Sequence, residues 1–184
     1  MKRKNGEIHV IAAVISLLLC SSAFSSEKVF TEYQVKSVFI YNFAKFVDWP
    51  EQAFSSEASP VNVCVLGEDP FGNEMDLLTK KSARGRGFDV LRFSKFKDKE
   101  ELKSCHLLFI SKSEESRIGS IIESLSGFGV LTISDVEGFM DSGGIIEFTM
   151  RENKVRFAVN LKASEQAGIR ISAKLLKLAE AVKK

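Results

Sequence analysis

Apolar residues between Tyr33 and Pro50 recur at three- and four-residue intervals and predict an amphipathic helix. Thr31 and Gln34 have the spacing of a capping box at its start, and Pro50 ends it. The predicted apolar stripe comprises Val35, Val38, Phe39, Phe43, Phe46 and Val47, and Lys36, Lys45 and Asp48 are expected to project elsewhere. We expect the stripe to cover a core, although such a stripe could also bind a membrane surface or a partner.

Four short runs rich in β-branched and aromatic residues follow and predict strands. They span 61–67, 88–93, 106–110 and 130–133, and a helix is predicted over 114–125 between the last two. Strands that alternate with helices indicate βαβ units and a mostly parallel sheet with helices on both faces. The first and third strands are often neighbours in such sheets.

The pattern changes towards the C-terminus. Apolar residues alternate strictly over 145–150 and 154–160, and the two-residue connection Glu152–Asn153 predicts an antiparallel hairpin. The residues from Ser172 to Lys184 predict a final helix with Leu175, Leu176, Ala179 and Val182 inward. The expected fold class is therefore α/β: a mostly parallel sheet with helices on both faces, plus a C-terminal antiparallel β-hairpin and helix.

The first residues have the three parts of a secretory signal: basic residues 2–4, an apolar run over 10–20, and small residues up to Ser25. The apolar run of about eleven residues is shorter than the twenty or so that cross a bilayer. We expect cleavage near Ser25 and export of residues 26–184 to the periplasm as a single domain. Lipidation at Cys20 and an uncleaved anchor are the alternatives.

Removal of residues 1–25 makes the chain electrically neutral. The 26 basic and 24 acidic residues of the whole sequence fall to 23 of each. A nucleic-acid partner is therefore not expected.

Two cysteines remain in the exported chain, Cys64 and Cys105. An even pair in an oxidising compartment predicts a disulfide, which the expected neighbouring strands would also bring together. A redox-active pair is the alternative, but a C-x-x-C spacing is lacking. A zinc site is less favoured, because His106 is the only histidine after cleavage.

No catalytic constellation emerges from the sequence. His106 lies at the start of a predicted buried strand without a G-x-S-x-G elbow, and a structural role is favoured. Asp135 and Glu137 are interpreted as solvated loop charges rather than an acid/base pair.

Three loops are candidate binding elements. Gly67–Gly72 follows a strand, and Arg84–Gly87 could hold an anion through Arg84 and Arg86, although turn glycines explain both segments more simply. The loop from Asp135 to Gly144 carries the apolar residues Phe139 and Met140. These either fill the core or, with Ile145 of the adjacent hairpin, form a partner-binding face.

Five ordered sequence blocks resemble the YfiR-like family of small periplasmic proteins. They are YQVKSVFIYNFAKFVDWP (33–50), VCVLGEDPFG (63–72), CHLLFIS (105–111), VLTISDVEGFMDSGGIIEF (130–148) and VRFAVNLKASEQAGIRISAKLLKLA (155–179).

The resemblance implies a periplasmic, non-enzymatic α/β domain without a cofactor, expected to be a homodimer. Its best-understood members restrain an inner-membrane diguanylate cyclase by binding its periplasmic portion, and are captured by an outer-membrane lipoprotein. Cys64 and Cys105 match the positions of a structural disulfide in the family, whereas a second cysteine pair near Gly143 and Gly144 is missing here. The resulting hypothesis is a regulator of cyclic-di-GMP signalling and biofilm. A small-anion or nucleotide-binding module that uses the Gly67–Gly72 and Arg84–Gly87 loops is the alternative.

Overall fold

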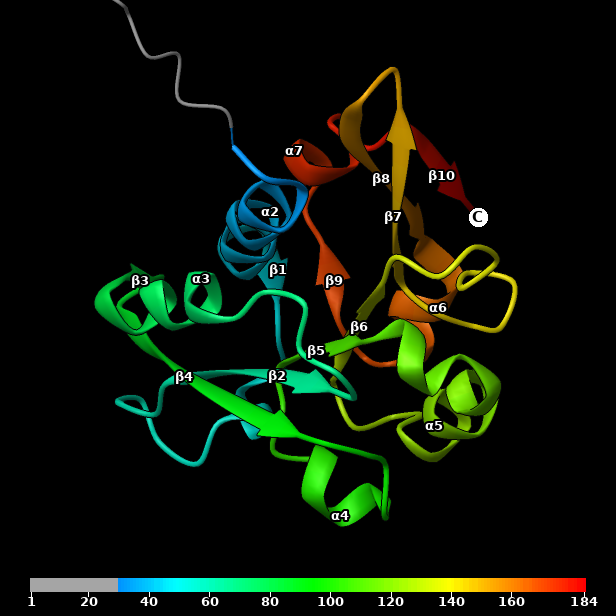
Figure 1. Ribbon diagram of the computed structural model, residues 1–184. Coiled ribbons are helices and arrows are strands. Elements are labelled where there is room, and N and C mark those ends of the chain that lie inside the picture. The colour runs from blue at the N-terminus through cyan, green and yellow to red at the C-terminus, as the bar shows by residue number, and fades with distance from the viewer. Residues whose placement is uncertain (1–29) are drawn as a thin grey trace, which may run out of the picture. The chain divides into compact units, whose positions relative to one another are not determined.

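An eight-stranded, mostly parallel sheet organises the computed structural model, which describes residues 30–184 (Figure 1). The predicted signal segment lies outside the described residues. The strands are β1 Val47–Asp48, β2 Val61–Leu66, β3 Ser82–Ala83, β4 Arg86–Phe93, β5 Leu107–Ile110, β6 Leu131–Ser134, β7 Ile146–Arg151, β8 Lys154–Asn160, β9 Arg170–Ile171 and β10 Ala181–Lys183. The α-helices are α2 Glu32–Phe46, α3 Asn73–Asp76, α4 Lys99–Leu102, α5 Ile118–Ser124, α6 Leu161–Gln166 and α7 Ala173–Leu176. Three 3-10 helices complete the order: η1 Glu51–Ala53, η2 Leu77–Lys80 and η3 Lys112–Arg117.

The strand order is β10-β8-β7-β6-β5-β2-β4-β3. Strands β4, β2, β5, β6 and β7 are mutually parallel, and β2 pairs with both β4 and β5. The predicted α/β class is confirmed, as is the neighbourhood of the first and third predicted strands. A separate two-stranded sheet joins β1 to β9.

Each face of the sheet has its own apolar core, because β2 and β5 are buried on both sides. Val63, Val65 and Phe109 point to the core under α2, α3 and α7. Cys64, Leu66 and Leu108 point to the opposite core, which α4 and α5 cover. Such continuous apolar strands are typical of parallel sheets with two covered faces.

Helix α2 begins with the predicted capping box. The backbone N–H of Thr31 donates to Gln34 Oε1 at 2.9 Å, and that of Gln34 donates to Thr31 Oγ1 at 3.3 Å. The expectation that the stripe covers a core is largely confirmed: Phe43 and Val47 are buried, and Val35, Phe39 and Phe46 pack against the same core. Two residues differ from it, because Val38 is 50% exposed and Lys36, which was expected to project elsewhere, is buried.

The predicted final helix is wrong beyond its first turn. Helix α7 ends at Leu176, and the chain then turns and forms the edge strand β10, parallel to β8. The backbone N–H of Glu180 donates to the carbonyl of Phe157 at 2.9 Å and starts this pairing. Unpaired backbone groups at the edge of a sheet attract a further strand, and here they outweigh the helical pattern of the segment.

The predicted hairpin is confirmed. Strands β7 and β8 pair antiparallel from Ile146 with Val159 to Arg151 with Lys154. Glu152 and Asn153 both have positive φ, 49° and 58°, as the two central residues of a type I′ turn require.

Candidate functional site

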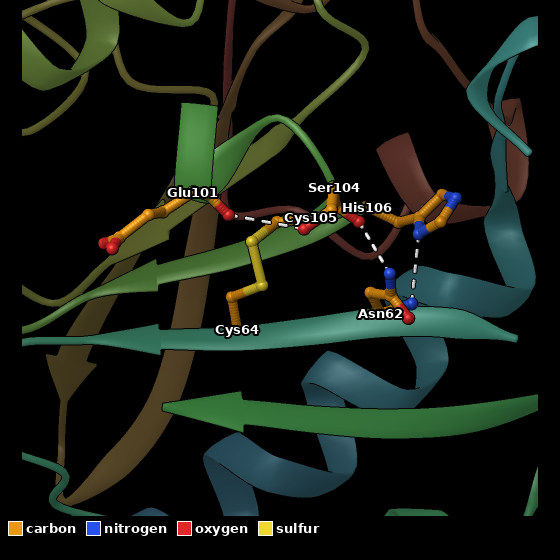
Figure 2. Close-up of a disulfide and its surroundings, with 6 residues drawn as sticks. All are labelled: Asn62, Cys64, Glu101, Ser104, Cys105 and His106. Carbon is orange, nitrogen blue, oxygen red and sulfur yellow. Dashed lines mark hydrogen bonds between the residues drawn. A yellow bond between two sulfur atoms is a disulfide. The ribbon is translucent and has the colours of Figure 1, made fainter. Parts of the chain in front are cut away.

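The disulfide Cys64–Cys105 joins two neighbouring parallel strands (Figure 2). Cys64 lies within β2 and Cys105 two residues before β5, with their Cα atoms 5.8 Å apart. Both residues are buried, in the core that α4 and α5 cover. The bond crosses 41 residues of sequence, and closing such a loop stabilises the fold by about 4 kcal/mol in the chain-entropy model.

His106 stands next to the bond and ties the segment before β2 to the sheet. Its Nδ1 accepts from the backbone N–H of Asn62 at 3.0 Å, and Nε2 lies 3.0 Å from the carbonyl of Ala53 (Figure 2 shows the Asn62 contact). Its ring stacks on Phe54 at 4.2 Å. Burial lowers the pKa of His106, and the charge of Arg86 adds to this. The structural role expected for this histidine agrees with these contacts.

The loop from Asp135 to Gly144 is folded around Phe139. Phe139 is 0% exposed and Ile145 is 2% exposed, so both lie in the core. The structure therefore corrects the expectation that these two side chains face a partner, because the space between the loop and α5 must be filled by an apolar group. Met140 is only partly buried and stays accessible.

Glu147 of β7 holds this loop in place. Its carboxylate accepts from the backbone N–H groups of Gly138 at 3.4 Å and Met140 at 3.0 Å. Asn160 Nδ2 donates to the carbonyl of Met140 at 3.2 Å. On the surface, Lys183 of β10 pairs with Asp141 at 2.7 Å and lowers the pKa of that carboxyl. The loop thus depends on the last strand of the chain.

The two candidate anion loops lie at opposite ends of the sheet. Strands β2 and β4 are parallel, with Val61 opposite Phe88 and Leu66 opposite Phe93. Gly67–Gly72 therefore follows the carboxyl end of β2, and Arg84–Gly87 lies at the amino end, about 20 Å away for a six-residue strand. The anion pocket predicted between these loops is wrong for this reason.

Protein groups already occupy the donors of the Gly67–Gly72 loop. The N–H of Glu68 donates to Ser113 Oγ at 2.9 Å, and that of Phe71 donates to Asp69 Oδ1 at 2.8 Å. Arg92 pairs with Asp69 at 2.7 Å. The loop is consequently a closed turn rather than a cradle.

A partly buried ionic cluster, which was not predicted from the sequence, lies where α2 meets the carboxyl end of β6. Lys36 is 2% exposed, and its Nζ lies 2.5 Å from Asp135 Oδ2 and also contacts Glu32. Tyr33 donates its hydroxyl to the same Asp135 oxygen at 2.9 Å, and the ring of Tyr33 lies 4.4 Å from Lys36 Nζ. Burial and the carboxylate of Asp135 raise the pKa of Tyr33. Asp135 is therefore a structural anchor and not a free loop charge.

The cluster joins two of the five sequence blocks, and all five lie within residues 33–180, the region that a family model matches. The model of the YfiR/HmsC-like family (DUF4154) matches residues 33–180. The chain belongs to the YfiR/HmsC-like family. Members are periplasmic regulators in cyclic-di-GMP signalling.

The fold of this YfiR/HmsC-like protein is similar to a solved structure, described as the crystal structure of a conserved domain protein from Vibrio cholerae O1 biovar El Tor str. N16961. The TM-score is 0.55 at 12% sequence identity. The similarity covers 84% of this chain and 61% of that one, so this chain spans about three fifths of its length. At this identity the likeness concerns the fold alone.

The described residues of the YfiR/HmsC-like chain contain no cluster of three or more His, Cys, Asp or Glu that could hold a metal ion. No helix within residues 30–184 is long and apolar enough to cross a bilayer.

The sequence did contain a signal for the ionic cluster. Lys36 has helical spacing with Tyr33, Ile40 and Phe43, and this spacing places it on the buried face of α2.

Two exposed apolar residues beside the hairpin were also missed. Met150 is 49% exposed and Leu178 is 65% exposed. Leu178 lines a surface groove of about 710 Å³ together with Arg151 and Arg156 of the hairpin. Met150 lines a neighbouring groove, and Arg151 borders both grooves. We call the tip of the hairpin, made of Met150, Leu178 and these two grooves, the hairpin face. No sequence signal identified it, because Leu178 was expected to belong to a helix.

Proposed function

We propose that this protein restrains an inner-membrane diguanylate cyclase by direct contact with the periplasmic portion of that enzyme. Membership of the YfiR/HmsC-like family, over residues 33–180, is the observation that carries the proposal. The protein acts by binding and not by catalysis, and export with cleavage near Ser25 brings residues 26–184 to the compartment of the target.

The hairpin face is the surface that we assign to this contact. It offers two large exposed apolar side chains next to a groove, and interfaces are commonly centred on such groups. Strand β10 pairs only with Ala158–Asn160 of β8, so within the described residues the outer edge of Lys154–Arg156 has no strand beside it. An extended segment of the cyclase could add to that edge.

A deletion strain tests the proposal. Loss of the gene should raise cyclic-di-GMP and biofilm, and the wild-type gene should restore both. The double variant Met150→Glu/Leu178→Glu should export normally yet fail to restore them, because charged groups oppose burial in an apolar contact. Leu77→Glu is the matched control: Leu77 is 48% exposed but lies on η2 near β4, at the other end of the sheet, and should restore both.

Unchanged cyclic-di-GMP in the deletion strain under several growth conditions would refute restraint of a cyclase. Full activity of the double variant would refute the hairpin face while leaving the regulatory function intact. Capture by an outer-membrane lipoprotein and a homodimeric state belong to the same proposal. Co-purification from envelope extracts tests the first, and sedimentation of the exported protein tests the second.

A further inference from the structure

A cavity of about 200 Å³ lies between the end of α2 and the start of β4, at the amino end of the parallel strands. Its floor is apolar and is formed by Ala44, Val47, Val61 and Ala83. The volume lies below the usual range for drug-sized ligands, roughly 300–1,000 Å³, so only a small molecule would fit. This site is far from the hairpin face in the order of strands, because β2, β5, β6 and β7 separate β4 from β8.

Two arginines of the β3–β4 turn line the cavity, each with one nitrogen already fixed. Arg84 Nη1 donates to the carbonyl of Val47 at 2.8 Å and contacts Asp48. Arg86 Nη1 donates to the carbonyls of Ser56 and Ser59, both at 2.8 Å. The Nη2 and Nε donors of both side chains remain available, because a guanidinium has five N–H groups.

Arg86 carries the charge that the surroundings do not neutralise. Arg84 is paired with Asp48, whereas no carboxylate among residues 30–184 pairs with Arg86. The guanidinium of Arg86 lies 3.8 Å from the ring centre of Phe54, which fixes its plane beside the cavity. A positioned, unpaired guanidinium at an apolar cavity is suited to a carboxylate.

Trp49 also borders the cavity. Its Nε1 is the only buried side-chain polar atom in the described part of the chain that lacks a hydrogen-bond partner. A buried donor without a partner calls for an explanation, and a bound molecule could supply its acceptor.

We propose that this cavity binds a small organic monocarboxylate with a planar apolar body. The body lies on the floor and against Trp49, and the carboxylate accepts from Arg86, whose plane Phe54 fixes. Asp48 and Glu51 also border the cavity and repel a second negative charge, so a monoanion is preferred to inorganic phosphate.

The sequence offers a direct probe, because Trp49 is the only tryptophan of the chain. Benzoate is titrated into the protein purified after export, and the fluorescence of Trp49 is recorded. We expect a saturable change with benzoate, and a much weaker one with benzyl alcohol or inorganic phosphate. Absence of a saturable change with benzoate would overturn the proposal, as would equal binding of benzyl alcohol.

Two variants locate the site. Arg86→Met should weaken benzoate binding about tenfold or more, since charge-assisted hydrogen bonds are lost. Glu51→Gln changes an exposed residue that makes no ion pair in the described chain, and should tighten binding about twofold by removing a repelling charge. Lys162→Met, at an exposed position of α6, is the control and should bind as the wild type does. Unchanged affinity in both Arg86→Met and Glu51→Gln would place benzoate elsewhere and refute this site.

Discussion

Lys36 of α2 and Asp135, which directly follows β6, form a partly buried ion pair with 2.5 Å between Nζ and Oδ2. Lys36 is buried, whereas the side chain of Asp135 keeps 15% of its surface exposed. The two residues lie 99 positions apart in the sequence, so the pair ties the start of α2 to the end of β6.

Replacing either member of this pair should destabilise the protein strongly. Lys36→Met leaves the partly buried carboxylate of Asp135 with only the Tyr33 hydroxyl, and Asp135→Asn leaves a buried ammonium with Glu32. Each change should lower the free energy of unfolding by about 3 kcal/mol, as measured by urea denaturation. The double variant should lose clearly less than the sum of the two, because the partners are coupled.

Lys45→Met is the control for this pair, since Lys45 lies on the exposed side of the same helix. Its effect should stay within about 0.5 kcal/mol. An equally small effect for Lys36→Met would contradict the structural importance of the pair.

Loss of the disulfide should lower the free energy of unfolding, because the unfolded chain regains the conformational entropy of the loop that the bond closes. Cys64→Ser/Cys105→Ser should lower the free energy of unfolding by about 4 kcal/mol in urea denaturation. Reduction of the wild-type bond should be slow in the folded protein, because both cysteines are at most 3% exposed. Rapid reduction by a mild thiol, followed under native conditions by thiol labelling, would instead indicate a redox-responsive bond.

His106 should make the protein less stable in mild acid. In the folded state its Nδ1 accepts from the Asn62 N–H, and burial holds its pKa below the usual 6.5. The unfolded chain therefore binds more protons, so the stabilisation is complete above about pH 6.5 and is lost as pH falls towards the folded pKa. Urea denaturation between about pH 7.5 and pH 5.5 should show this decline.

His106→Asn is the matched variant for the pH series. Its amide oxygen can accept from Asn62 but does not titrate, so its stability should vary less over the same pH range. No other histidine follows residue 9, so an equal decline in the variant would assign the effect to carboxyl groups instead.

A methyl group at Gly144 should damage the loop around Phe139. A Cβ placed there would lie 2.2 Å from the Phe139 ring, which is fully buried and cannot move away cheaply. Gly144→Ala should therefore lower the midpoint of urea denaturation, by an amount that corresponds to about 1–3 kcal/mol.

Gly119→Ala should have the opposite effect on stability from Gly144→Ala. Gly119 lies within α5, and its added Cβ would meet nothing within 4 Å, so this change should raise stability by about 0.5–1 kcal/mol. A destabilised Gly119→Ala, or a tolerated Gly144→Ala, would show that the packing around these positions differs from that described.

The sequence by itself determined the features whose cause is local. Repeating apolar runs and turn residues predicted the α/β class, the strands β2, β4, β5, β6, β7 and β8, and the hairpin at Glu152–Asn153. The capping box of Thr31 and Gln34 set the start of α2. The count of two exported cysteines predicted the disulfide, because an oxidising compartment leaves few other states for such a pair.

Only the tertiary structure decided the rest, since each remaining feature depends on residues that are distant in sequence. Asp135 drew Lys36 inward, although a charged residue was expected to project away from the core. The open edge of β8 converted the predicted final helix into β10. The parallel pairing of β2 and β4 separated the two candidate anion loops, and packing under α5 buried Phe139. In each case a long-range contact outweighed the local pattern, because burial and pairing energies exceed the differences in helix propensity between residues.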